Sequence, residues 1–294
     1  MASFIAPNLS QLRAPPTPVG DLALNRLARL PRIPDLLTTA NLACGVASIL
    51  LASQGQLTIA CGLIFLAAVF DVFDGLAARA LGGGTPLGAQ LDSLADMVSF
   101  GVAPAFALFK SSAWIRASMD HPAGWTIYPP LSGLEVPVET WSWMSFAASL
   151  TLVVASCWRL AKFNLDTRQS SGFLGLPTPS NGLFWIALVL ISEEHWLHGG
   201  FGSGLLVSWI KAFLGNHGAL LAASLVMAIL MLSELPLPSL KFKHKGWKGN
   251  EVIFLLIGIG AVLIALYGVL AVPLILIIYL LSPLWGKLFP KHPA

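Results

Sequence analysis

The chain has 294 residues, of which 56% are hydrophobic and only 11% are charged. Soluble domains carry about 25% charged residues, so this composition excludes an ordinary soluble protein and indicates a chain embedded in a bilayer. A formal net charge of +3 could suggest a nucleic-acid partner, but the Lys and Arg residues stand at the ends of apolar segments, where they suit anionic lipid head groups. We therefore expect a membrane lipid partner and no nucleic acid.

The N-terminal residues precede the first apolar segment. Residues 1–20 are rich in Pro and lack the apolar stretch and cleavage site of a secretory signal, which predicts a disordered segment. Over residues 21–33, leucines alternate with Asn and Arg at nearly helical spacing, which predicts an amphipathic helix lying on the membrane surface. The rest, residues 34–290, is expected to form a single transmembrane catalytic domain.

Eight apolar segments in that domain are long enough for a helix to cross the hydrocarbon core, which takes about 20 residues. We therefore predict an all-α integral membrane protein with about eight transmembrane helices. The predicted spans are residues 34–53, 56–80, 88–110, 139–163, 181–197, 216–233, 251–268 and 271–288.

The distribution of basic residues predicts the orientation of these spans, because positive charge is retained on the cytoplasmic side of short loops. With the N-terminus in the cytoplasm, all but three of the 17 Lys and Arg residues fall in cytoplasmic segments; the exceptions are Lys110, Arg116 and Lys211. We expect both termini to be cytoplasmic, and the loops at 111–138 and 198–215 to face the opposite side.

Four aspartates interrupt the second and third spans, where an ionised group costs a few kcal/mol unless it meets a partner. Asp71 and Asp74 are three residues apart and Asp92 and Asp96 are four apart, so each pair lies on one helical face. The short connector at 81–86 makes the two spans antiparallel neighbours and brings the pairs together near the cytoplasmic side. Such clustered carboxylates predict a Mg²⁺ or Mn²⁺ site, where phosphate oxygens of a substrate complete the coordination.

Small residues lie beside the aspartates and would let a ligand approach the helix backbones, although small residues also serve ordinary helix packing. The whole pattern reads Asp71-x-x-Asp74-Gly75-x-x-Ala78-Arg79, eight residues, Gly88-x-x-x-Asp92-x-x-x-Asp96. This pattern resembles, without any departure, the signature of the CDP-alcohol phosphatidyltransferase family.

The resemblance implies a six-helix core, here with two further helices, a homodimer, and an active site open to the cytoplasm and to lipid. The implied ligands of the metal, two ions of Mg²⁺ or Mn²⁺, are Asp71, Asp74, Asp92 and Asp96. The implied contacts of the cytidine diphosphate portion of CDP-diacylglycerol are Gly75, Ala78, Arg79 and Gly88. Asp96 would also be the general base for an acceptor hydroxyl that attacks the lipid-side phosphorus as CMP departs.

Five further segments resemble the phosphatidylserine synthase branch of that family; they are residues 34–45, 99–105, 159–164, 175–180 and 235–242. The chain departs from the branch at Asp35, where Asn is more common, and at Lys162, where Arg is common. The branch implies L-serine as the acceptor, whose carboxylate Arg159 or Lys162 could hold. The alternative role of these two cations is a positive-inside anchor.

Other functions remain open at this point. The same reaction could use glycerol phosphate or inositol phosphate as the acceptor. Intramembrane aspartates also mark the pathways of divalent-cation transporters, although Arg79 beside the cluster suits phosphate better than a cation pathway. Asn41, inside the first span, is assigned only to hydrogen bonding between helices. The expected location is a bacterial or archaeal plasma membrane.

Overall fold

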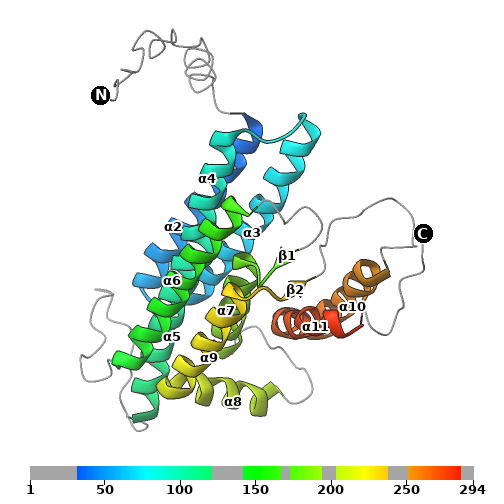
Figure 1. Cartoon of the computed structure of the whole chain (residues 1–294). Helices are drawn as coiled ribbons and strands as arrows, with labels where there is room; N and C mark the ends of the chain where they lie inside the picture. The colour runs from blue at the N-terminus through cyan, green and yellow to red at the C-terminus, as the bar shows by residue number, and fades with distance from the viewer. Residues whose placement is uncertain (1–31, 121–141, 167–172, 194–202, 238–250, 286–294) are drawn as a thin grey trace, which may run out of the picture.

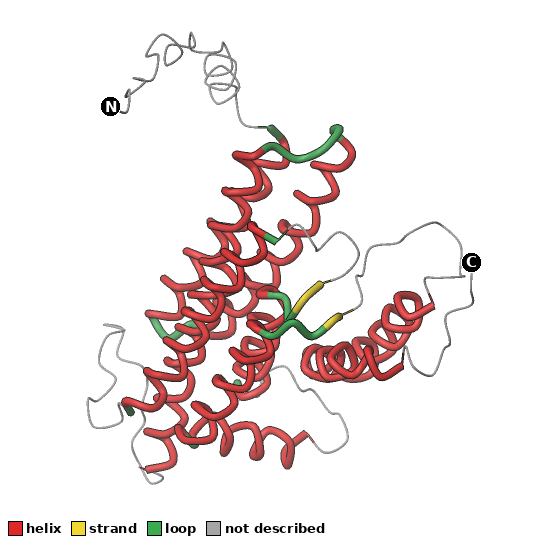
Figure 2. The backbone as a smooth tube through the Cα atoms, in the orientation of Figure 1, coloured by secondary structure: helices red, strands yellow, loops and turns green. Residues whose placement is uncertain are grey.

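The computed structural model describes residues 32–120, 142–166, 173–193, 203–237 and 251–285. The predicted disordered segment at 1–20 lies outside the described residues, as does the predicted amphipathic helix at 21–33 except for its last two residues. Within the described residues the chain is helical apart from two strands of two residues each (Figures 1 and 2). The predicted all-α membrane class is confirmed.

The first two helices form a closely packed antiparallel pair, α2 (Ile33–Ser53) and α3 (Leu57–Ala80). The turn between them contains Gly55 with φ 80°, a left-handed conformation that glycine adopts without steric cost. Both helices agree with the predicted spans at 34–53 and 56–80. The pair occupies the blue and cyan side of the molecule in Figure 1.

The third span is one long helical stretch, Pro86–Met119, with a change of pitch inside it. It consists of α4 (Pro86–Asp96), the π-helix η2 (Met97–Val102) and α5 (Ala103–Asp120). Thr85 caps α4 by accepting a hydrogen bond from the Gly88 N–H at 2.9 Å, and Pro86 suits the first turn because that position needs no donor. Short π-helical segments often occur at functional sites, and this one begins directly after Asp96.

The remaining helices pack against this frame. α6 (Trp143–Leu165) packs along α9 (His217–Leu232), while α7 (Thr178–Ser192) lies in the centre and contacts α3, α5 and η2. α8 (Ser203–Gly215) meets α9 at an angle of 86°. The last two helices, α10 (Glu251–Tyr267) and α11 (Ala271–Trp285), are joined by the 3-10 turn η4 (Gly268–Leu270).

A small antiparallel ribbon, β1 (Phe173–Leu174) and β2 (Pro236–Leu237), lies where the segments at 175–180 and 235–242 meet. Gly175 follows β1 with φ 72°, and a Cβ atom there would lie 2.6 Å from the Ser233 carbonyl oxygen. Only glycine fits this position, because both the backbone conformation and the space exclude a side chain. The ribbon thus joins the entry of α7 to the exit of α9.

The number of spans differs from the eight that we predicted. Five described helical stretches are long and apolar enough to cross a membrane, and six if the bent pair α8–α9 counts as one. α7, with only 15 residues, is shorter than a membrane span. α10, η4 and α11 together supply one apolar stretch, Gly258–Leu281, where two spans were predicted. The expected loops at 111–138 and 198–215 are also partly helical, because α5 extends to Asp120 and α8 begins at Ser203.

The centre of the molecule is packed through small residues around η2. A Cβ atom on Gly45 of α2 would lie 2.8 Å from the Ser99 Cα, and one on Gly182 of α7 would lie 2.8 Å from the Phe100 carbonyl oxygen. Small residues at such contacts let helix backbones approach closely in membranes. This close packing fixes α2, η2 and α7 relative to one another.

Candidate active site

Three of the four predicted aspartates come together between α3 and α4. Asp71 and Asp74 of α3 and Asp92 of α4 each offer a carboxylate oxygen, and these oxygens all lie within 4.8 Å of one another. α2 packs against both α3 and α4, whereas these two helices make little direct backbone contact with each other. The carboxylates therefore face one another across a space between two helices that a third helix holds in place.

The donor chemistry of this cluster fits a divalent cation. Three carboxylates of like charge repel one another unless a cation lies between them, and an apolar surrounding increases that repulsion. Hard oxygen donors from carboxylates are the ligands that Mg²⁺ and Mn²⁺ prefer, usually completed by water and phosphate oxygens. The three aspartates could hold such an ion; the residues do not identify which one.

Asp96 is placed differently from the other three. It is buried at the end of α4, beside Asp71, with which its side chain interacts, and it lies outside the group of three. The Asn41 Nδ2 donates a hydrogen bond to Asp96 Oδ1 at 3.2 Å, and the Ser99 hydroxyl donates to the Asn41 carbonyl oxygen at 2.9 Å. Asn41 of α2 thus joins Asp96 to the start of η2.

Thr38 gives α2 a second contact with the aspartates. Its hydroxyl oxygen lies 2.6 Å from Asp74 Oδ2 and 3.0 Å from the Pro34 carbonyl oxygen. A hydroxyl has one proton, so it donates to the nearer and charged acceptor, Asp74. This hydrogen bond orients the carboxylate of Asp74, the most buried residue of the three by exposed fraction.

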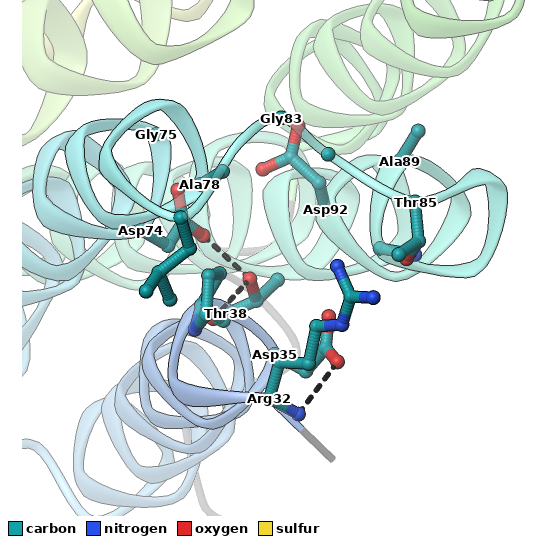
Figure 3. A pocket seen from close by; sticks show the side chains of 14 residues that line it. Arg32, Asp35, Thr38, Asp74, Gly75, Ala78, Gly83, Thr85, Ala89 and Asp92 are labelled. Carbon is teal, nitrogen blue, oxygen red and sulfur yellow. Dashed lines mark hydrogen bonds between the residues drawn. The ribbon is translucent and has the colours of Figure 1, made fainter. Parts of the chain in front are cut away.

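A cavity of about 170 Å³ adjoins the carboxylate cluster. Figure 3 shows Asp74 and Asp92 on its wall together with the predicted small residues Gly75 and Ala78, and Gly88 also lines it. The predicted Arg79 is not part of the lining; it lies on the same helix one turn further, where its guanidinium approaches Gly75. Without side chains at 75 and 88, the helix backbones themselves form much of the wall.

The opposite wall comes from α2, whose contribution the sequence interpretation missed. Arg32, Asp35 and Thr38 line the cavity, and the Asp35 carboxylate accepts a hydrogen bond from the Arg32 N–H at 2.9 Å. Asp35, Thr38 and Asn41 follow one another at intervals of three residues, so they lie on one face of α2. That polar spacing within an apolar span was the signal that could have identified them.

Arg159 and Lys162, the predicted acceptor contacts, line a second cavity of about 270 Å³. Arg159 is only 6% exposed, its guanidinium lies 5.0 Å above the Phe163 ring, and it interacts electrostatically with Asp96. Nearby, the Asn164 amide donates to the Ser93 hydroxyl at 2.9 Å, which ties the end of α6 to α4. The second cavity therefore lies beside the helix that carries Asp92 and Asp96.

Comparisons with known proteins agree with one another on the family that the chain resembles. The sequence model of the CDP-alcohol phosphatidyltransferase family matches residues 32–230. The CDP-diacylglycerol–serine O-phosphatidyltransferase of Helicobacter pylori (strain J99) is 27% identical over 234 residues, covering 79% of this chain and 81% of that protein. The archaetidylserine synthase of Methanothermobacter thermautotrophicus is 29% identical over 208 residues, covering 70% and 69%. The CDP-diacylglycerol–serine O-phosphatidyltransferase of Bacillus subtilis is 29% identical over 156 residues, covering 53% and 74%.

Proposed function

Because this chain belongs to the CDP-alcohol phosphatidyltransferase family, we propose that it transfers a phosphatidyl group from CDP-diacylglycerol to the hydroxyl of L-serine. The chain is a multi-pass membrane enzyme that transfers a substituted phosphate group from a CDP-alcohol. The observation that carries the proposal is the cluster of Asp71, Asp74 and Asp92 oxygens within 4.8 Å of one another, beside a cavity with glycine walls. This arrangement suits a diphosphate that is bound through divalent cations.

In this proposal, Asp71, Asp74 and Asp92 hold two divalent ions, Mg²⁺ or Mn²⁺, with Asp96 at the edge of the same site. When bound, the ions would neutralise the charge that develops on the phosphate oxygens during transfer. The protein contributes the position of the carboxylates, since α2 holds α3 and α4 on either side of the cluster. Thr38 keeps the Asp74 carboxylate aimed at the cluster through its 2.6 Å hydrogen bond.

The cytidine diphosphate portion would bind in the first cavity, where Gly75, Ala78 and Gly88 leave room for the ligand to approach the α3 and α4 backbones. Arg79 lies one turn from Gly75 at the end of α3 and can pair with phosphate as a bidentate donor. Both features favour a nucleotide diphosphate over a bare cation, so the family match and the cavity together leave no support for the transporter alternative.

Asp96 is the proposed general base. It would accept the proton of the acceptor hydroxyl while that oxygen forms a bond to the lipid-side phosphorus. The bond from this phosphorus to the bridging oxygen breaks, and CMP leaves with the electron pair. The hydrogen bond from Asn41 and the neighbouring Arg159 hold the Asp96 carboxylate in place.

L-Serine is the proposed acceptor because two of the relatives are named for transfer to serine and a third is an archaetidylserine synthase. Arg159 and Lys162 are the cations that would meet its carboxylate. Lys162 is exposed at the end of α6 and could equally serve as a positive-inside anchor. Arg159 is buried, and an anchor at the head-group level has no need of burial.

The orientation is part of the proposal. We propose that the metal site opens to the cytoplasm of a bacterial or archaeal cell, that both termini lie there, and that the protein is a homodimer. In the eight-span arrangement predicted from the sequence, all but three of the 17 basic residues fall on the cytoplasmic side. The archaeal and bacterial relatives are compatible with either kind of lipid backbone.

The test is CMP release by the purified protein in detergent with CDP-diacylglycerol and Mg²⁺ or Mn²⁺. Serine, glycerol phosphate and inositol phosphate are added in separate reactions, with Asp92→Asn as the inactive control. We expect release with serine alone and phosphatidylserine in equal amount. Release with glycerol phosphate or inositol phosphate instead would keep the reaction and reject serine, and no release with any acceptor would reject the enzyme function.

A further inference from the structure

The second cavity is lined by charged side chains of both signs. Its cations, Arg159 and Lys162, come from the last turns of α6, whereas Glu234 follows the end of α9 on the other side. Leu232 and Ser233 also line the cavity, so the C-terminal end of α9 faces it. The C-terminal end of a helix dipole favours a positive charge, as the Glu234 carboxylate does. The α9 side therefore suits a cation, whereas the α6 side carries two cations together with the Asp166 carboxylate.

Arg159 brings a buried hydrogen-bond donor without a partner to the α6 side of this cavity. Its side chain is 6% exposed, and its Nη2 has no hydrogen-bond partner among the described residues. A buried guanidinium nitrogen without a partner is costly, and the cost falls when an anionic group accepts its hydrogen bond. The Phe163 ring, 5.0 Å from the guanidinium carbon, fixes the direction of the group without satisfying this donor.

We propose that this cavity recognises the acceptor as a zwitterion, with Arg159 binding the carboxylate and Glu234, at the C-terminal end of α9, binding the ammonium group. The inference rests on the proposed function, because it takes an amino acid as the acceptor. It adds a specificity-determining residue, Glu234, which reaches the cavity from α9 whereas the two cations come from α6. Glycerol phosphate and inositol phosphate have no ammonium group, so Glu234 repels them while it attracts serine.

The first part of the test separates the ammonium contact from the rest of the reaction. Initial rates of CMP release are measured for wild type and Glu234→Gln with serine and with 3-hydroxypropanoate, which is serine without the ammonium group. We expect Glu234→Gln to raise KM for serine about tenfold or more, the effect of losing a charge-assisted hydrogen bond. KM for 3-hydroxypropanoate, which lacks the ammonium group, should stay constant or fall. KM for CDP-diacylglycerol should not change, and this unchanged value also shows that the variant is folded.

Asp166→Asn is the matched control, because Asp166 lines the same cavity but follows α6, on the side of the cations. It removes the same charge, so a general electrostatic effect would raise KM for serine as much as Glu234→Gln does, and that result would overturn the specific contact. An unchanged KM for serine in Glu234→Gln would also overturn it while leaving serine transfer intact. If wild type instead releases CMP only with glycerol phosphate, the proposed function fails and this inference fails with it.

Discussion

The space between α3 and α4 and the contact around η2 are two neighbouring regions with opposite packing. Around η2, helices approach so closely that Gly45 and Gly182 have no room for a methyl group. Between α3 and α4 the backbones stay apart, and carboxylates with small residues line the opening. Asp92 faces the open region, and Asp96, one turn later, lies at the border with the packed one.

This difference explains how four acidic side chains can be kept in an apolar bundle. The packed region holds α2 and the η2 segment rigidly, and α2 in turn fixes Asp74 through Thr38 and Asp96 through Asn41. The open region is thereby kept free of packed side chains, as the proposed binding of a cation and a diphosphate requires. The mutations below are expected to affect one region without the other.

The largest effects are expected from the carboxylates. Asp96→Asn should abolish turnover, by at least a hundredfold, because a general base contributes about that much or more, while CDP-lipid binding stays largely intact. Asp71→Asn should abolish turnover and also weaken metal-dependent binding of the CDP-lipid. The measurement is CMP release together with equilibrium binding of CDP-diacylglycerol with and without Mg²⁺. Equal loss of binding in both variants would contradict separate roles for these aspartates.

In the packed region around η2, mutations should change the stability of the fold instead of the activity. Gly45→Ala places a methyl group against the Ser99 backbone at 2.8 Å, and we expect it to lower the free energy of unfolding by about 1–3 kcal/mol. Gly62→Ala in α3 is the control, since a Cβ there meets nothing within 4 Å. That change should stabilise the helix by up to about 1 kcal/mol. The free energy of unfolding in detergent is measured for both variants. If Gly45→Ala and Gly62→Ala change it equally, the contact between α2 and η2 has room for a methyl group.

The smallest effect is expected where the two regions meet. Thr38→Val removes the hydrogen bond to Asp74, and we expect about a tenfold higher Mg²⁺ concentration for half-maximal activity, because hydrogen bonds to charged groups contribute about 1.5–3 kcal/mol. Thr39→Val is the control, since the exposed Thr39 hydroxyl donates to the Asp35 carbonyl oxygen instead. A Mg²⁺ dependence that shifts equally in both variants would remove the orienting role of Thr38.

Local spacing correctly predicted that Asp71, Asp74 and Asp92 come together. Asp71 and Asp74 lie one turn apart on α3, and a short connector leads to the helix that carries Asp92, so their proximity could be expected from the sequence, although α2 holds the two helices in place. Thr38 and Asn41 could not be assigned in this way, because their partners are 36 and 55 residues away. Their contacts depend on how α2 packs against α3 and α4, which periodicity does not specify.

The membrane spans show the same limit, because the sequence pattern does not specify how helices pack. Hydropathy located the long apolar helices, but it does not distinguish a helix that faces lipid from one enclosed by protein. α7 is almost wholly buried among α3, α5 and η2, so its 15 residues need not match the thickness of the bilayer. The angle between α8 and α9 depends on tertiary packing, so the pattern of apolar residues could not predict it either.

The most direct test of the account is Mn²⁺ binding measured by electron paramagnetic resonance on wild type, Asp92→Asn and Asp96→Asn, each with CDP present. If the space between α3 and α4 is a divalent-metal site, wild type binds Mn²⁺, Asp92→Asn binds it at least about tenfold more weakly, the order expected when a ligand is lost, and Asp96→Asn retains most of the affinity. Mn²⁺ binding by Asp92→Asn as tight as that of wild type would contradict the account.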